Sequence, residues 1–171
     1  MPHWNLAVEL LRKLLLGEIK ARGRRNIVQA RSFAEMLEAA IRRYQNRAIE
    51  SAQVIEELIA LAEEMREAGR RGEKLGLTED EVAFYDALEV NDSAVKVLGD
   101  EALKTIAQEL VQAVRNSVTI DWTMRENVRA RIRVMIKRIL RKHGYPPDKQ
   151  ERATQTVLEQ AEVLCAEWAV A

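Results

Sequence analysis

A row of basic residues at four-residue intervals is the part of this sequence with the clearest capacity for binding chemistry. The row consists of Arg125, Arg129, Arg133, Lys137 and Arg141. Residues four apart share one side of an α-helix, and residues 125–142 include eight basic residues and one acid. Such a face can bind the phosphates of duplex DNA or an acidic partner protein. It can also be a solvated face that pairs with acidic helices of the same chain, such as residues 50–67, and we favour this internal role.

The residue types that most often carry catalysis are few here, or stand where structure alone accounts for them. His143 ends a predicted helix, where an imidazolium complements the helix dipole. Cys165 is in phase with the apolar side of the last predicted helix, so we predict a small buried hydrophobic residue. The sequence has no phosphate-binding glycine loop, no serine nucleophile motif and no Cys-x-x-Cys pair. We therefore predict no catalytic residue, no cofactor site and no metal site.

Three clusters combine aromatic side chains with polar or charged ones. They contain Tyr44, Asn46 and Arg47, then Phe84, Tyr85 and Asp86, and finally Asp121 and Trp122 followed by Arg125. Aromatic residues at helical spacing usually belong to the core, with a polar tip bonded nearby. We predict a structural role for each cluster, in which Asp86 and Asp121 can form buried ion pairs with the arginine residues and so fix how helices dock.

All elements that carry these residues are predicted helices, and one of them is long. An apolar stripe from Phe33 to Ala62 takes eight steps over 29 residues, which is the 3.6-residue period of a straight α-helix. A capping box at Ser32 and Glu35 precedes it. We predict one helix from Ser32 to about Glu67, roughly 50 Å long at 1.5 Å per residue. A break near Asn46 is the main alternative.

Shorter helices are predicted on both sides of this one. Residues 4–22 form an amphipathic helix, and glycines make residues 69–76 a mobile turn. Further capping boxes begin helices at Thr78 and Thr123, Asn91 caps a short turn, and Pro147 stands in the first turn of the last helix. Residues 117–121 alone have strand character, and they are too few for a sheet.

The composition fits a helical globular domain. The chain has 171 residues, of which 47% are hydrophobic and 32% charged, and its 27 basic and 27 acidic residues balance. Zero net charge argues against a protein that coats nucleic acid, although a local basic patch is compatible with it. One cysteine cannot form a disulfide within the chain, and no apolar run approaches the roughly 18 residues of a membrane span. We expect a cytoplasmic all-α protein: a single helical domain over residues 1–171, built as an irregular bundle of about six helices around one long central helix.

Short motifs along nearly the whole chain resemble one family. They include Asn5-x-Ala-x-Glu-Leu-Leu-Arg-Lys-Leu-Leu15, Arg43-Tyr-Gln-Asn-Arg-Ala-Ile49, Val54-Ile-Glu-Glu-Leu-Ile59, Ala83-Phe-Tyr-Asp-Ala-Leu88, Leu103-Lys-x-Ile-Ala-x-Glu-Leu110, Asp121-Trp-Thr-x-Arg125 and Tyr145-Pro-Pro147. In this order they resemble the C-terminal helical domain of the R subunit (HsdR) of type I restriction enzymes.

The resemblance implies a division of labour. The R subunit of this family carries a nuclease domain and two ATP-driven motor domains that move DNA, and its helical region is associated with assembly. We therefore expect this chain to be the helical domain of a longer polypeptide, with ATP and Mg²⁺ needed only in the other domains. The implied partners are the methyltransferase and specificity subunits, the subunit's own motor domains and duplex DNA.

Two functions fit this picture, and a third is disfavoured. The first is a non-catalytic docking domain that attaches the motor subunit to the methyltransferase–specificity core. The second is a DNA-contacting module whose basic helix, residues 125–142, guides the duplex. A self-contained enzyme is the third.

Overall fold

The computed structural model describes residues 2–47, 49–90, 92–117 and 126–170, and over these residues the chain is all-α. The described part forms nine α-helices and one short 3₁₀ helix, and it has no strand. These helices group into two compact units, each with its own hydrophobic core. One comprises Met1–Gly23 and Gln29–Arg71, and the other Arg24–Val28 and Gly72–Ala171.

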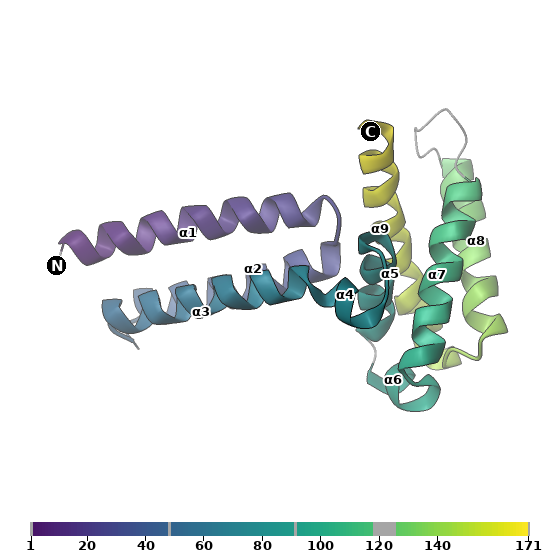
Figure 1. Cartoon of the computed structure of the whole chain (residues 1–171), viewed down its shortest axis with the longest axis horizontal. Coiled ribbons are helices and arrows are strands. Elements are labelled where there is room, and N and C mark those ends of the chain that lie inside the picture. The colour runs from purple at the N-terminus through teal and green to yellow at the C-terminus, as the bar shows by residue number, and fades with distance from the viewer. Residues whose placement is uncertain (1, 48, 91, 118–125, 171) are drawn as a thin grey trace. The chain divides into compact units, whose positions relative to one another are not determined.

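The first unit is built from three long helices. They are α1 (Pro2–Gly23), α2 (Ile27–Gln45) and α3 (Ser51–Gly69). In Figure 1, α1 lies beside α3 and runs in the same direction, while α2 runs the opposite way. Each helix contributes one apolar stripe to a shared core, as an amphipathic helix must. Leu15, Leu37 and Leu58 represent the three stripes.

The single long helix predicted from Ser32 to Glu67 is wrong, and the alternative break near Asn46 is correct. The N–H of Arg47 bonds to the carbonyl of Tyr44 at 3.0 Å, and Arg47 has a φ of 58°. This left-handed conformation ends α2, a position that glycine usually occupies. The predicted capping box at Ser32 is also wrong, because α2 already begins at Ile27 and Ser32 lies inside it.

The second unit surrounds a short helix whose central residues are all buried. Its α-helices are α4 (Arg71–Leu75), α5 (Glu79–Glu89), α6 (Asp92–Leu98), α7 (Asp100–Ser117), α8 (Glu126–Lys142) and α9 (Gln150–Val170). Helix α5 packs against both α7 and α9, and α8 in turn packs against those two helices (Figure 1). Every residue from Val82 to Leu88 is buried, so α5 is the central element of this unit. The predicted core around a long helix is therefore replaced by two cores, one of them centred on α5.

Local sequence signals set several helix ends in the second unit. The predicted capping box at Thr78 and Glu81 is present in both directions and starts α5. The predicted mobile turn at residues 69–76 is wrong, because Arg71–Leu75 form α4. A Cβ at Gly72 would lie 2.8 Å from the carbonyl oxygen of Leu77, so only glycine fits there. Pro147 was predicted in the first turn of the last helix, but it lies in a 3₁₀ turn, Pro147–Lys149, that directly precedes α9.

Three sequence predictions fall outside the described residues. They are the capping box that begins at Thr123, the cap at Asn91 and the strand-like residues 118–121.

A buried glutamine ties the start of α2 to α9. Gln160 is fully buried, and its Oε1 accepts a hydrogen bond from the N–H of Ile27 at 2.9 Å. Its Nε2 donates to the carbonyl of Arg25 at 2.7 Å. Nearby, Asn26 donates to the buried carboxylate of Asp86 at 2.8 Å. The segment Arg24–Val28 is therefore an integral part of the second unit.

Candidate interaction surfaces

Most of the predicted basic row on α8 pairs with acidic residues of α9. Arg129 lies 2.9 Å from Glu162, Lys137 lies 2.8 Å from Glu151, and Arg133 lies 3.6 Å from Glu151. The hydrogen bond from Lys137 and its charge lower the pKa of Glu151. Three cations of the row therefore form ion pairs within the chain. Their partners are in α9, however, and the predicted partners at residues 50–67 belong to the other unit.

Arg125 and Arg141, the first and last residues of the row, are not part of these ion pairs. Arg141 is exposed and forms no ion pair with any described residue. Arg125 lies outside the described residues, as do Asp121 and Trp122 of the third cluster.

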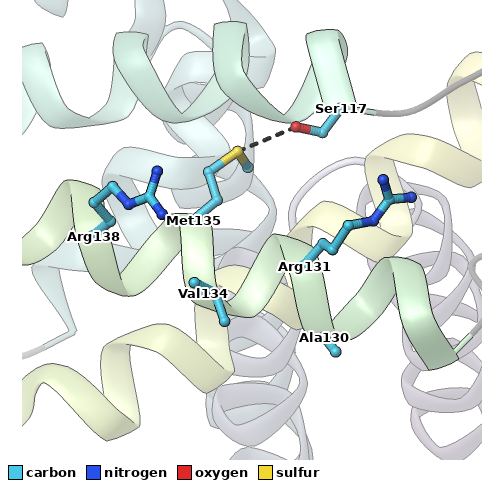
Figure 2. A pocket seen from close by; sticks show the side chains of 6 residues that line it. All are labelled: Ser117, Ala130, Arg131, Val134, Met135 and Arg138. Carbon is cyan, nitrogen blue, oxygen red and sulfur yellow. Dashed lines mark hydrogen bonds between the residues drawn. The ribbon is translucent and has the colours of Figure 1, made fainter.

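A second basic face of α8 points away from α9. Figure 2 shows Arg131 and Arg138 on either side of Val134 and Met135. Neither guanidinium has a hydrogen bond or ion pair within the described structure, and the Val134 side chain is 56% exposed. The four residues, with Ala130 and Ser117, line an open pocket of about 470 Å³ beside the end of α7. This is a cationic surface with an apolar centre.

The first unit has its own exposed apolar surface on α1. Leu6, Leu10 and Leu14 recur every four residues on one side of the helix, and their exposed fractions are 72%, 59% and 59%. Single exposed leucines are common on protein surfaces, whereas larger contiguous apolar patches are less so. We call these three residues the leucine stripe.

His143 contacts an acid of α7 instead of acting only as a helix-terminal charge. Its Nε2 lies 2.5 Å from Glu109 Oε2, and Lys142 lies 3.1 Å from Glu109 Oε1. The hydrogen bond from His143 is the main cause of a lowered Glu109 pKa, and Lys142 adds to it. The cluster joins the middle of α7 to the C-terminal end of α8 and leaves His143 in a structural position.

Cys165 is buried as predicted. Its side chain belongs to the core of the second unit, and burial raises the pKa of the thiol to about 11, with Glu162 adding to the shift. A thiol with so high a pKa is a poor nucleophile at neutral pH.

The two described polar-aromatic clusters have structural contacts. Tyr44 is half-buried against the first core and accepts a 3.4 Å hydrogen bond from Ser51, while Asn46 and Arg47 form the exposed end of α2. Phe84 is fully buried, and the hydroxyl of Tyr85 donates to Asp100 at 3.1 Å. The carboxylate of Asp86 accepts a hydrogen bond from the side-chain amide of Asn26.

Gln160 and Tyr145 are among the buried polar residues that were not predicted from the sequence. The Tyr145 hydroxyl donates to the carbonyl of Leu88 at 2.8 Å and is buried with it. The position of Gln160 on the apolar side of α9, one residue before Ala161, was an available signal for burial.

Other kinds of site find no support among the described residues. No group of three or more His, Cys, Asp or Glu side chains there could hold a metal ion. None of the described helices is long and apolar enough to cross a membrane.

Comparison with known proteins gives a consistent assignment. Residues 1–167 match the family described as type I restriction enzyme HindI endonuclease subunit-like, C-terminal. The chain is 41% identical over 163 residues to the type I restriction enzyme HindI endonuclease subunit of Haemophilus influenzae, which covers 95% of this chain and 16% of that protein. It is 34% identical over 137 residues to the putative type I restriction enzyme MjaIXP endonuclease subunit of Methanocaldococcus jannaschii, which covers 80% of this chain and 13% of that protein.

The chain thus spans about one sixth of the length of these relatives or less. No solved structure matches it significantly. The family match over nearly the whole chain agrees with the motifs in the sequence and with the all-α fold. We conclude that this chain belongs to the family of C-terminal regions of type I restriction enzyme endonuclease subunits.

Proposed function

We propose that this chain is a non-catalytic assembly domain, which docks an ATP-dependent DNA translocase and endonuclease subunit onto its methyltransferase–specificity core. Family membership supports a place in such a subunit. The observation that carries the docking role is the leucine stripe of α1, because Leu6, Leu10 and Leu14 together expose more apolar surface than isolated surface residues do.

The leucine stripe has the properties of a helix that fits into an apolar groove. Its residues repeat with the helical period, and α1 is anchored from the opposite side by Val8, Leu15 and Ile19 in the core of the first unit. A partner can therefore cover the stripe without unfolding the unit. Leucine side chains buried in an interface each contribute about 1.5–3 kcal/mol of transfer free energy, before the cost of association.

A DNA-contacting module is the alternative function, and the ion pairs of α8 weaken its basis. Three of its five predicted cations already lie beside the carboxylates of Glu151 and Glu162. Phosphate contacts would have to compete with these pairs. We therefore place docking first.

The test is capture of the purified methyltransferase–specificity core by the full 171-residue chain, with and without duplex DNA. We expect capture without DNA and with little dependence on salt, because the centre of the interface is apolar. Leu10→Glu should abolish capture, while Met36→Glu, which changes an exposed apolar residue of α2, should leave it intact. Failure of the unmodified chain to capture the core would refute the docking role. Capture by Leu10→Glu at full strength would refute only the choice of surface.

A further inference from the structure

Two exposed faces of this chain carry matching triads of opposite charge. The α8 triad is Arg131, Val134 and Arg138, and the α3 triad is Glu56, Ile59 and Glu63. Both follow the spacing i, i+3, i+7, which places three side chains on one narrow face of a helix. In each triad an apolar residue stands between two like charges.

The α8 triad is free to receive a partner. Arg131 and Arg138 have no counter-charge among the described residues, and Val134 and Met135, which lie between them along α8, also line the pocket (Figure 2). The two arginines are about 10.5 Å apart along the helix axis, at 1.5 Å per residue. An occupant would need two anionic groups at this separation and an apolar group between them.

The α3 triad has these features. Glu56 and Glu63 are exposed, neither pairs with a cation of the described chain, and the Ile59 side chain between them is 48% exposed. Two other acids of the same helix are engaged, since Glu57 pairs with Arg43 and Glu67 with Arg70, while Glu64 is exposed beside Glu63. The two glutamates have the same spacing as Arg131 and Arg138, so side-by-side helices would join both charge pairs and bury Ile59 against Val134.

We propose that the α8 triad binds the α3 triad of a second copy of this chain. A protein occupant fits better than DNA, because the centre of the α8 face is apolar, and apolar centres rimmed by arginine are typical of protein interfaces. The chain provides both faces, so two copies can exchange the contact in both directions or associate head to tail. A contact of three side chains per face is small, and self-association is expected at about 10–500 μM chain.

Sedimentation equilibrium of the full 171-residue chain over this concentration range tests the proposal. The unmodified chain should rise above its monomer mass of 19.5 kDa as concentration increases. Both the Arg131→Glu/Arg138→Glu variant and the Glu56→Arg/Glu63→Arg variant should raise the dissociation constant at least about tenfold, because attraction becomes repulsion at two pairs. Mixing the two variants restores one complete α3–α8 contact per pair, so the mixture should associate although each variant alone does not.

Lys13→Glu/Lys20→Glu is the matched control, with the same reversal at the same seven-residue spacing on α1, and it should associate like the unmodified chain. Circular dichroism and melting of each variant show that it is folded. A chain that stays monomeric throughout, variants that associate normally, or a mixture that remains monomeric would each overturn the proposal. It would also be overturned if Arg131→Glu/Arg138→Glu abolished binding to a short DNA duplex and left self-association unchanged. Core capture, tested separately with Leu10→Glu, does not depend on this result.

Discussion

Gln160 binds the first peptide N–H of α2, that of Ile27, through a side-chain oxygen buried in the second core. The first N–H groups of an α-helix have no partner within the helix, so a buried one must find an acceptor elsewhere. The same amide donates to the carbonyl of Arg25, which leaves both of its polar ends satisfied.

Replacing Gln160 should therefore unfold the second unit more readily. Gln160→Leu keeps the volume but leaves the Ile27 N–H and the Arg25 carbonyl without their partner, and we expect a loss of about 2–4 kcal/mol in the free energy of unfolding. Urea denaturation measures it. Gln155→Leu, on a half-buried position of the same helix, is the control and should cost much less. Equal effects would mean that the amide contributes no specific stability.

Because Arg47 has a left-handed conformation, the effect of Arg47→Gly on the free energy of unfolding distinguishes a break after α2 from one continuous helix. A non-glycine residue there costs about 1–2 kcal/mol, so Arg47→Gly should raise the free energy of unfolding by up to about 1 kcal/mol. If residues 32–67 formed one continuous helix, the same change would lower it by about 1 kcal/mol. Ala39→Gly, at an exposed position inside α2, is the control, and it should lower the free energy of unfolding by about 1 kcal/mol.

These two cases indicate what the sequence could and could not predict. Periodicity found the helical regions and the apolar stripe on both sides of Arg47, because burial on one side of a helix leaves a direct trace in residue order. The break leaves no such trace, since Arg47 is not glycine and the two stripes stay in phase across it. The central place of α5 was missed for a different reason. A helix buried on every side has no amphipathic pattern, and the apolar residues from Val82 to Leu88 were too few to indicate this alone.

The partners of α8 also depended on tertiary packing. The four-residue row was visible in sequence, but the acids that neutralise it lie on α9, which the sequence could not place beside α8. Arg131 and Arg138 fell outside the row and were only part of the count of basic residues. In the structure both are exposed, as Arg141 is, and Val134 lies between them.

The Glu109 cluster predicts a pH dependence. Bonds from His143 and Lys142 lower the pKa of Glu109 below its ordinary value of 4.5, so the folded state holds the charged carboxylate more favourably than the unfolded state does. Its contribution to stability is fully present above pH 4.5 and is lost as the pH falls through the lower pKa of the folded state. Because the carboxylate is about one third exposed, water screens the effect, and Glu109→Gln should cost less than about 1 kcal/mol at neutral pH. Urea denaturation at about pH 7 and pH 3 should show the difference from the unmodified chain shrinking at the lower pH. If the difference in stability between Glu109→Gln and the unmodified chain were the same at both pH values, the predicted pH dependence would be wrong.

Cys165 should be chemically silent in the folded chain. Its thiol is buried and its pKa is raised to about 11, so both access and thiolate formation are restricted. We expect a thiol reagent to label Cys165 only in denaturant, with one equivalent per chain. Cys165→Ala should keep the fold at a modest cost in stability, whereas rapid labelling of native protein would show that this part of α9 opens easily.

The paired and unpaired cations of α8 should differ in what they contribute to stability. Arg129 is the closest cation to Glu162, and one oxygen of that carboxylate is shielded from water without any hydrogen bond. Removing the arginine leaves a negative charge partly buried and uncompensated, so Arg129→Gln should lower the free energy of unfolding by about 1–2 kcal/mol. Arg131→Gln, two residues away on the exposed side, removes no internal contact and should change it by less than about 0.5 kcal/mol.

Thermal melting of Arg129→Gln and Arg131→Gln measured side by side tests this difference in stability. Both changes remove one positive charge from the same helix. Added salt should reduce the difference in melting temperature between the two variants, because part of the Arg129 contribution to stability is electrostatic. Equal melting temperatures would mean that the Arg129–Glu162 pair is only a surface contact, and that Arg129 is available to bind a partner. A lower melting temperature for Arg129→Gln alone would place the cations available to a partner at Arg131 and Arg138, on the side of α8 that faces away from α9.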